Sequence, residues 1–235
     1  MDITLPYFNC SNNYICASIE NMEPTSKERV LKKIRKALIH KTSVPFPNTD
    51  QNLSVYKAPE DSLDIIFAQE FTKIQGNFIY CASINEFINS ISHVAEEKKW
   101  NHLFCWENPL QDLFQRFDFN KCRVGKSLDK ADAGVTLCEC LIARTGTVLL
   151  SSRQLSGRTL PIFPPVHITV AYTSQLFFDL KDATQFLQKK YEGNLPSMIS
   201  FATGPSRTAD IEKTLVLGAH GPKEVYVFLI DDPVR

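Results

Sequence analysis

The residues with the clearest potential for binding chemistry lie between Gly204 and Asp210, where an apolar stretch is followed by Gly-Pro-Ser-Arg-Thr-Ala-Asp. We predict a strand, a turn and a helix start there. This arrangement turns unpaired backbone N–H groups and the positive end of a helix dipole toward a ligand, and it favours an anion. Arg207 can contact a carboxylate or phosphate with two N–H groups, and the hydroxyls of Ser206 and Thr208 are further donors.

The same residues also have a purely structural explanation. Ser206 or Thr208 can cap the amino end of the helix that we expect to begin near Ala209. Arg207 can form an ion pair at the surface, which contributes little to stability. Asp210 argues against an anion site, because a carboxylate near the helix start repels a negative ligand unless it pairs with Arg207 or meets a ligand hydroxyl. Both interpretations stay open at this point.

A second polar region runs from 143 to 165. Thr145, Gly146 and Thr147 predict a tight turn that enters an apolar strand, and a loop with three serines, Arg153 and Arg158 follows. Such hydroxyl and backbone groups can bind a small polar ligand, and an arginine can neutralise its charge. A hairpin turn with solvated arginines explains the residues equally well. Neither region ends in Gly-Lys-Ser/Thr or contains Gly-x-Gly-x-x-Gly, so nucleotide hydrolysis and ordinary dinucleotide binding are not predicted.

A histidine flanked by glycines follows in Gly218-Ala219-His220-Gly221-Pro222, just before the last apolar run. In such a turn His220 is approachable, so it is a candidate proton donor or acceptor near neutral pH, beside Gly221. His167 follows two prolines at the start of another predicted strand and could converge on the same edge. A single histidine is more often a hydrogen-bonded structural residue. The sequence has neither a Gly-x-Ser-x-Gly elbow nor a His-Glu-x-x-His motif.

The seven cysteines are scattered and include no Cys-x-x-Cys pair. Zinc sites and iron–sulfur clusters need clustered thiolates. We therefore expect reduced, mostly buried cysteines, no metal site and no iron–sulfur cluster in this chain. Cys138 and Cys140 are expected to share one face of a strand.

The charges balance, with 26 basic and 26 acidic residues. A neutral chain has no net field to attract nucleic acid or an anionic membrane. No run approaches the roughly 20 apolar residues that a membrane helix needs, and the amino terminus lacks the pattern of a leader peptide. We expect a cytoplasmic protein that binds no nucleic acid and does not span a membrane.

The elements that must position these residues alternate along the chain. Residues 1–58 predict an arm, with an amphipathic helix over 25–41 that we expect to lie on the domain rather than on a membrane, and a linker over 42–58. From 59 to 235 short apolar runs alternate with helical spans, which is typical of βαβ units. We predict an α/β fold with a Rossmann-like, mostly parallel sheet flanked by helices. The predicted strands are 78–82, 102–106, 147–150, 168–172, 198–202 and 225–230, and the predicted helices are 60–74, 84–99, 109–117 and 180–191.

Glycine points to the same half of the chain as the candidate residues. Eight of the nine glycines lie after residue 120. Glycine is used where the backbone adopts positive φ or approaches a ligand closely. We therefore expect the functional turns in the carboxy-terminal half.

Five motifs follow one another in the second half of the chain. They are Ala133-Gly134-Val135-Thr136, Ile142-Ala143-Arg144-Thr145-Gly146-Thr147, Arg158 with Pro164-Pro165-His167, Gly204-Pro205-Ser206-Arg207-Thr208-Ala209-Asp210-Ile211-Glu212, and Gly218-x-His220-Gly221-Pro222. In this order they resemble the LUD domain, specifically the lactate utilization protein C family, and the likeness covers about residues 60 to 232. It implies a fold similar to the NagB/RpiA/CoA transferase-like fold of sugar-phosphate isomerases and CoA transferases. Arg144 departs from the family pattern, in which an acidic or polar residue is expected before Thr-Gly-Thr.

The resemblance implies a part in oxidising L-lactate to pyruvate, together with two partner proteins that carry iron–sulfur clusters. This chain resembles the small member without clusters, and no cofactor is identified for it. In this hypothesis a small anion, lactate or another carboxylate, binds in the carboxy-terminal half. Its expected contacts are Arg158 and Arg207 for the charge, Thr145, Thr147 and Ser206 for orientation, and His220 for a proton.

Two alternatives remain. The chain can be a stand-alone enzyme that acts on a phosphorylated or CoA-linked metabolite, as relatives of similar fold do, and Glu139 is then a candidate nucleophile or base. The structural explanation of Glu139, a carboxylate satisfied by Arg144 or by a backbone donor, is favoured over that role. The other alternative is a regulatory binding module without catalysis, which would use the same binding site in the carboxy-terminal half.

Overall fold

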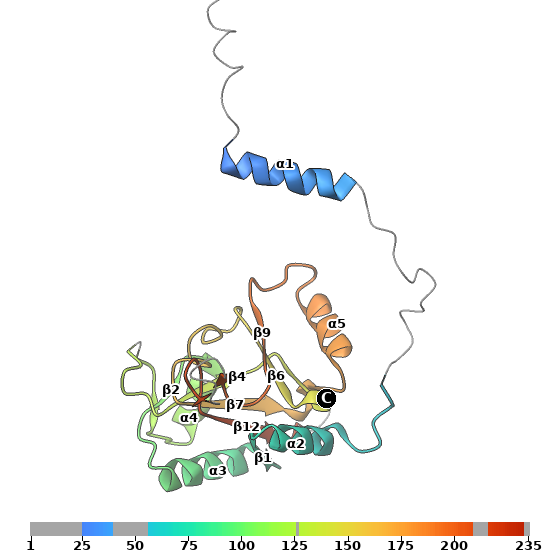
Figure 1. The fold of residues 1–235 in the computed structure, drawn as a ribbon. Coiled ribbons are helices and arrows are strands. Elements are labelled where there is room, and N and C mark those ends of the chain that lie inside the picture. The colour runs from blue at the N-terminus through green and yellow to red at the C-terminus, as the bar shows by residue number, and fades with distance from the viewer. Residues whose placement is uncertain (1–24, 40–55, 126, 209–215, 233–235) are drawn as a thin grey trace, which may run out of the picture. The chain divides into compact units, whose positions relative to one another are not determined.

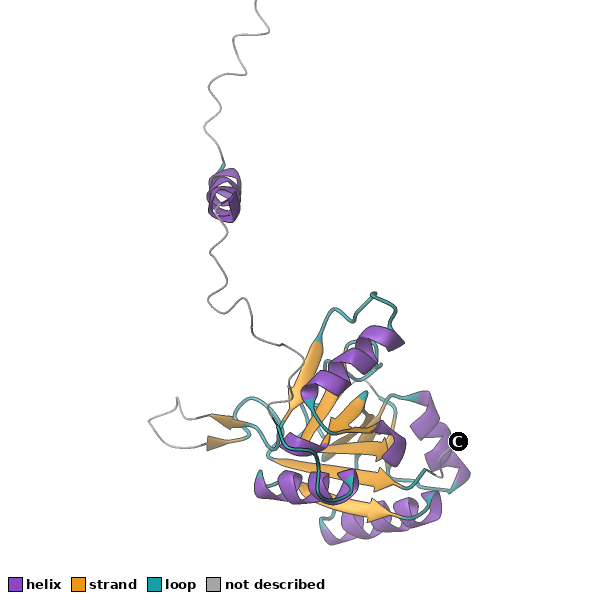
Figure 2. Ribbon diagram, turned by 90° about the vertical axis from the view of Figure 1, so that its right-hand side faces the viewer, coloured by secondary structure: helices purple, strands orange, loops and turns teal. Residues whose placement is uncertain are grey.

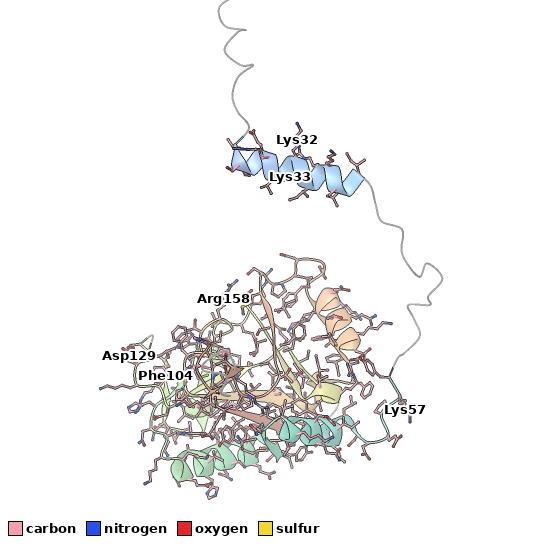
Figure 3. All side chains as sticks on the ribbon, in the orientation of Figure 1. Lys32, Lys33, Lys57, Phe104, Asp129 and Arg158 are labelled. Carbon is pink, nitrogen blue, oxygen red and sulfur yellow. The ribbon has the colours of Figure 1, made fainter. Side chains whose placement is uncertain are left out.

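The computed structural model describes residues 25–39, 56–125, 127–208 and 216–232, and the chain divides into two compact units, Met1–Tyr56 and Lys57–Arg235. In the first unit the described helix is α1 (Ser26–Ile39), close to the predicted helix over 25–41. Thr25 and Glu28 exchange hydrogen bonds at its start, as in a capping box. None of its residues is buried, and Lys32 and Lys33 on it are labelled in Figure 3.

The second unit is built on a six-stranded sheet in which every neighbouring pair of strands is parallel. This confirms the predicted α/β class and the mostly parallel central sheet. Most of the predicted strands and helices lie within a few residues of the observed ones. The strands in spatial order are β1 (Asn77–Cys81), β12 (Glu224–Ile230), β7 (Val166–Tyr172), β4 (Ala133–Leu137), β2 (Leu103–Cys105) and β3 (Cys122–Arg123).

Both faces of the central sheet are covered, so its strands are apolar at odd and even positions. In β12, Phe228 packs with Phe87 and Phe114 on one face, and Val227 packs with Phe67 on the other. Each fully buried side chain of this size contributes roughly 1.5–3 kcal/mol. In Figure 1 α3 lies below the sheet, while β6, β9 and α5 lie above it. The helices are α2 (Leu63–Lys73), α3 (Ile84–Glu97), α4 (Asn108–Arg116) and α5 (Leu180–Lys190).

A second, four-stranded sheet was not foreseen from the sequence. Its order is β8-β5-β6-β9, and β6 runs antiparallel to both of its neighbours. One face packs toward α2 and the central sheet, and the other packs on Ala183 and Leu187 of α5. The strands are β8 (Leu176–Phe177), β5 (Cys140–Ile142), β6 (Thr147–Ser151) and β9 (Ile199–Ala202), and the short helices η1 (Ala143–Thr145) and η2 (Thr173–Gln175) lie in their connections.

Two expectations need correction here. Cys138 and Cys140 do not share a strand, because β4 ends at Leu137 and β5 begins at Cys140, and the two thiols belong to different core clusters. Arg207 and Thr208 form a strand, β10 (Arg207–Thr208), which pairs with β11 (Val216–Leu217) in a short ribbon that projects from the domain in Figure 2. Arg207 and Thr208 therefore lie in a strand and not in the predicted turn.

Some expectations fall on residues that the structure does not describe. The helix predicted to begin near Ala209, with Asp210 in its first turn, lies outside the described residues, and so does most of the linker over 42–58. The domain boundary at residue 58 stays a prediction. None of the helices among the described residues has the length and hydrophobicity needed to cross a bilayer.

The order of the central strands predicts where a ligand would bind. From β2 the chain passes through α4 to β3 at the sheet edge, and then returns to β4 on the other side of β2. The connections after β2 and after β4 therefore lead in opposite directions. In α/β sheets such a switch point opens a crevice beyond the carboxyl ends of the two strands, and ligands bind there.

Candidate functional site

A cleft of about 450 Å³ lies at this switch point. Residues that follow β2 and β4 line it, together with the end of β7, the loop after β6 and the end of α5. Its volume falls within the range of about 300–1,000 Å³ that is typical of small-molecule sites. The charged and phenolic side chains that line the cleft are Glu107, Glu139, Arg153, Tyr172, Lys190 and Tyr191.

Glu139 and Arg153 are sequence-predicted residues that line this cleft. The carboxylate of Glu139 is 2 % exposed, and both oxygens are bound. Oε1 accepts hydrogen bonds from Ser151 Oγ at 2.5 Å and from Tyr191 Oη at 2.7 Å, and Oε2 accepts one from Lys190 Nζ at 2.7 Å. Burial raises the pKa of Glu139, but these three donors outweigh it and hold the pKa below its ordinary value. Glu139 is therefore ionised at neutral pH.

The donors to Glu139 differ from those expected. Arg144 instead binds Asp179, with its Nη2 2.7 Å from Asp179 Oδ1. Asp179 in turn caps α5, where its side chain accepts a hydrogen bond from the N–H of Leu180. The departure at Arg144 is thus explained by a local ion pair that anchors the start of the helix carrying Lys190.

Lys190 and Arg153 give the cleft its positive charge. Burial lowers the pKa of Lys190, but its hydrogen bond with Glu139 raises it more, so the ammonium stays charged. Arg153 Nη2 donates to the carbonyl of Asn194 at 3.2 Å, and its guanidinium lies 5.8 Å from the ring centre of Tyr191. Lys190 and Arg153 both line the cleft, so two cations are available there to an anionic ligand.

Glu107 is a second buried carboxyl in the cleft, and the sequence analysis missed it. It is 5 % exposed, and its Oε1 accepts a hydrogen bond from Ser156 Oγ. Among the described atoms, Oε2 has no hydrogen-bond partner. Burial raises the pKa of Glu107 above its ordinary value, because the hydrogen bond from Ser156 and those from the backbone compensate only in part. The signal available in the sequence was its place directly after the predicted strand 102–106.

The two carboxyls thus have pKa values displaced in opposite directions within one cleft. Such divergence between neighbouring titratable groups is typical of sites where one group donates a proton and another stays charged. Glu139 holds a cation in place, and burial makes the protonated form of Glu107 more accessible than that of an exposed glutamate by raising its pKa. The cleft can therefore bind a small anion and donate a hydrogen bond to it.

Several other predicted residues meet at the opposite, amino-terminal edge of the central sheet, around the end of α2. We call Thr145, Gly146, Thr147, Gly204 and Arg207 the amino-edge group. Thr147 Oγ1 lies 2.8 Å from Thr145 Oγ1, and Arg207 Nη2 donates to the carbonyl of Ile74 at 2.8 Å. Arg207 also donates to the side-chain oxygen of Gln75 at 3.0 Å. Arg207 thus joins β10 to the residues at the end of α2, and Gly146 and Gly204 lie close to the backbone of Phe71 and Ile74 there.

Ser206 and Gly221 lie near the start of β12, at the same amino-terminal edge. Ser206 N donates to the carbonyl of Pro222 at 2.9 Å, and a Cβ on Gly221 would lie 2.8 Å from Ser206 Cβ. His220, in the same turn, is exposed. None of these described residues lines the cleft at the carboxyl ends of β2 and β4, which we call the carboxyl-edge cleft.

The remaining predicted residues lie elsewhere. Arg158, labelled in Figure 3, is exposed and donates from Nη2 to Ser197 Oγ at 2.7 Å, on the loop before β9. Arg158 and Arg207 therefore bind different partners and are not brought together by any contact between described residues. Thr208 pairs with Val216 in the ribbon. Phe104 and Asp129, also labelled in Figure 3, line a separate hollow of about 490 Å³.

His167 lies inside the domain rather than at an edge where a ligand would bind. It is buried, and its Nε2 lies 2.9 Å from Thr136 Oγ1. Burial lowers its pKa to about 4, so the imidazole is neutral at pH 7. The five described cysteines are free, and no group of three or more metal-ligating side chains occurs in the described part of the chain.

Comparison with known proteins identifies the family. The family model described as LUD domain matches residues 25–230. The chain belongs to the LUD domain family. This confirms the resemblance drawn from the five motifs.

Relatives of this LUD domain include proteins named lactate utilization protein C. The one from Halalkalibacterium halodurans is 28 % identical over 186 residues, which cover 73 % of this chain and 80 % of that protein. The one from Shouchella clausii is 39 % identical over 103 residues, which cover 43 % of this chain and 45 % of that protein. The second match therefore spans less than half of the relative.

The fold of this LUD domain is similar to a crystal structure of a DUF162 family protein from Deinococcus radiodurans. The TM-score is 0.54 with 18 % sequence identity, and the match covers 73 % of this chain and 99 % of that one. This likeness shows the fold alone. The expected similarity to the NagB/RpiA/CoA transferase-like fold stays a prediction.

Proposed function

We propose that this LUD domain takes part in lactate utilization as a cytoplasmic subunit without clusters, which binds a small carboxylate in the carboxyl-edge cleft. Iron–sulfur partner proteins then accept the two electrons released when L-lactate is oxidised to pyruvate. The family membership and the names of the relatives support the role. The absence of any Cys-x-x-Cys pair in the sequence supports the division of labour, because clusters need grouped thiolates.

The observation that carries the proposal is the pairing of Lys190 with Glu139 at the wall of the cleft. Glu139 holds the ammonium in one place, and the ammonium has two further N–H groups for a ligand. Arg153 lines the same cleft and adds a second cation. A carboxylate bound there would make charge-assisted hydrogen bonds, which are about twice as strong as neutral ones.

The roles expected for Arg158, Arg207 and His220 stay predictions. Arg207 and the rest of the amino-edge group have structural contacts that account for them without a ligand. Arg158 has a partner in Ser197 and His220 is exposed, so either could still meet a ligand or a partner protein. The cleft is the better candidate because its charged groups converge on one cavity.

The test is lactate-dependent dye reduction by the chain reconstituted with its iron–sulfur partners. We expect Lys190→Met to lower the rate at least tenfold, the loss expected for a charge-assisted contact. Lys189→Met is the matched control, because Lys189 is the exposed neighbour on α5, and it should leave the rate unchanged. Lys190→Arg should retain part of the rate, and melting curves check the fold. Full dye reduction in the absence of this chain would contradict the proposal.

A stand-alone enzyme acting on a phosphorylated or CoA-linked metabolite is the second candidate, because Glu139 lines the same cleft. Three hydrogen bonds occupy its oxygens, so nucleophilic attack would require Lys190, Ser151 or Tyr191 to move first. Turnover of a sugar phosphate or an acyl-CoA by the isolated chain, lost in Glu139→Gln, would favour this candidate. Ligand binding without any turnover, alone or in the reconstituted complex, would favour a regulatory module.

A further inference from the structure

Glu107 is a buried carboxyl that the proposed function does not yet use. It occupies the N-cap position of α4, yet its side chain makes no capping hydrogen bond. Serine, threonine, aspartate and asparagine are the residues preferred at an N-cap, because their short side chains reach the free N–H groups. A residue that breaks this local rule is expected mainly at functional sites.

Only one of the two carboxyl oxygens of Glu107 has a hydrogen-bond partner among the described atoms. Ser156 Oγ donates to Oε1, while Oε2 is buried and has no partner among the described atoms. Buried polar atoms in native proteins nearly always have a partner, so an exception calls for an explanation. Because Glu107 lines the cleft, a ligand in the cleft can supply the missing partner.

The environment of Glu107 favours a carboxyl that donates. Burial raises its pKa, and no cation is among the causes that act on it. The titratable and charged groups around it are few: Cys105 on β2 and, elsewhere in the cleft, Glu139, Arg153, Tyr172, Lys190 and Tyr191. With Ser156 donating to Oε1, the hydrogen of a protonated carboxyl lies on Oε2, the oxygen without a partner.

We propose that Glu107 binds the ligand of this cleft through Oε2, by donating a hydrogen bond to an oxygen beside the ligand's carboxylate. The inference rests on the proposed function and narrows the ligand class to small 2-oxo acids and their 2-hydroxy counterparts. Lys190 and Arg153 bind the carboxylate, and Glu107 binds the 2-oxygen. A protonated carboxyl can donate to the carbonyl oxygen of the oxo acid or to the hydroxyl oxygen of the hydroxy acid, whereas an ionised carboxylate would repel the carbonyl oxygen, so binding of the oxo acid depends more on the protonated form.

The experiment measures binding of pyruvate and of L-lactate to the full chain by calorimetry, in the wild type and in three variants. Glu107→Gln keeps an N–H donor of similar shape, so pyruvate should bind within about threefold of the wild type. Glu107→Ala removes the donor, and the Kd for pyruvate should rise at least tenfold. Asp112→Asn, an exposed change on the same helix, is the matched control and should bind as the wild type does.

The pH profile distinguishes a ligand contact from a structural role. The raised pKa of Glu107 predicts that the affinity of the wild type for pyruvate falls as the pH rises and Glu107 ionises, whereas the affinity of Glu107→Gln should change far less. A melting curve for each variant checks that it is folded. A substitution that weakens binding only by disturbing the structure of the cleft would lower the affinity for pyruvate by the same factor at every pH.

The outcomes separate this inference from the proposed function. If the wild type binds pyruvate and Glu107→Ala binds it equally well, Glu107 is not a ligand contact, while the proposed carboxylate site stands. If the wild type binds neither pyruvate nor L-lactate, this inference is overturned. If the reconstituted complex also fails to reduce dye with lactate, the proposed function fails as well.

Discussion

The ammonium of Lys190 lies 2.7 Å from the carboxylate of Glu139, and the two ends of this ion pair differ in exposure, with side chains 44 % and 2 % exposed. A buried carboxylate is costly unless donors satisfy it, and Ser151 and Tyr191 complete the set. The buried end of the pair therefore stabilises the fold, and the exposed end presents a cation to the cleft.

Replacing Glu139 with glutamine tests how much its buried carboxylate stabilises the fold. Glu139→Gln keeps the shape but removes the charge, so we expect the free energy of unfolding to fall by about 2 kcal/mol at pH 7. Tyr191→Phe removes one donor and should cost about 1 kcal/mol. Urea denaturation measures both changes.

The effect of Glu139 should also depend on pH. Because its pKa is lowered in the folded state, its stabilisation is present above the ordinary Glu value of about 4.3 and is lost as the pH falls through the folded value. The gap between the wild type and Glu139→Gln should therefore narrow at low pH. A gap of constant size across this range would show that the charge of Glu139 contributes nothing to folding.

His167 should make the domain sensitive to mild acid. Its pKa is lowered to about 4 by burial, so its contribution is present above the unfolded value of about 6.5 and is lost as the pH falls toward 4. That loss is about 3 kcal/mol over the interval. Glutamine does not titrate and can keep a hydrogen bond with Thr136, so His167→Gln should lose less stability between pH 7 and pH 4.5. Equal losses in urea titrations of the two proteins would contradict the assignment.

The central sheet was predictable because several of its strands and covering helices have strong sequence patterns. The apolar run of β12 and the helical spacing of α3 each dictate one element type. β4 escaped prediction because three of the four residues in Ala133-Gly134-Val135-Thr136 are small or polar. The second sheet depends on antiparallel pairings between short segments such as β6 and β9, which no local pattern specifies.

The candidate site was predictable only in part, for a similar reason. Glycine-rich turns drew attention to the amino-edge group, and several of those residues do meet, but through contacts with α2. The cleft brings Glu139 together with Lys190, which lies 51 residues away in the sequence, and with Glu107. None of these residues belongs to a motif. Their convergence follows from the strand order, which the sequence alone does not specify.

Arg207 offers a test of whether the amino-edge group is structural. Its guanidinium donates to the carbonyl of Ile74 at the end of α2, and a cation there also complements the helix dipole. We expect Arg207→Ala to lower the free energy of unfolding by about 1 kcal/mol, measured in urea, and to leave the affinity for pyruvate unchanged. A weaker affinity with unchanged stability would return Arg207 to the role of an anion ligand.

Gly146 should be the position where a single methyl group disturbs the amino-edge group most. Its φ is +59°, and a Cβ would lie 2.6 Å from the backbone N of Phe71 in α2, which cannot give way without shifting the helix. A left-handed backbone costs a non-glycine residue roughly 1–2 kcal/mol, and a forced shift in a packed core costs about 1–3 kcal/mol more. We expect Gly146→Ala to lower the free energy of unfolding by about 3 kcal/mol.

Gly193→Ala is the matched control, because Gly193 has a φ of +82° with nothing within 4 Å of a Cβ, so it should cost only about 1 kcal/mol. Equal losses in the two variants would mean that the contact between the β5–β6 turn and α2 yields easily, and the turn would then be no anchor for the residues around it.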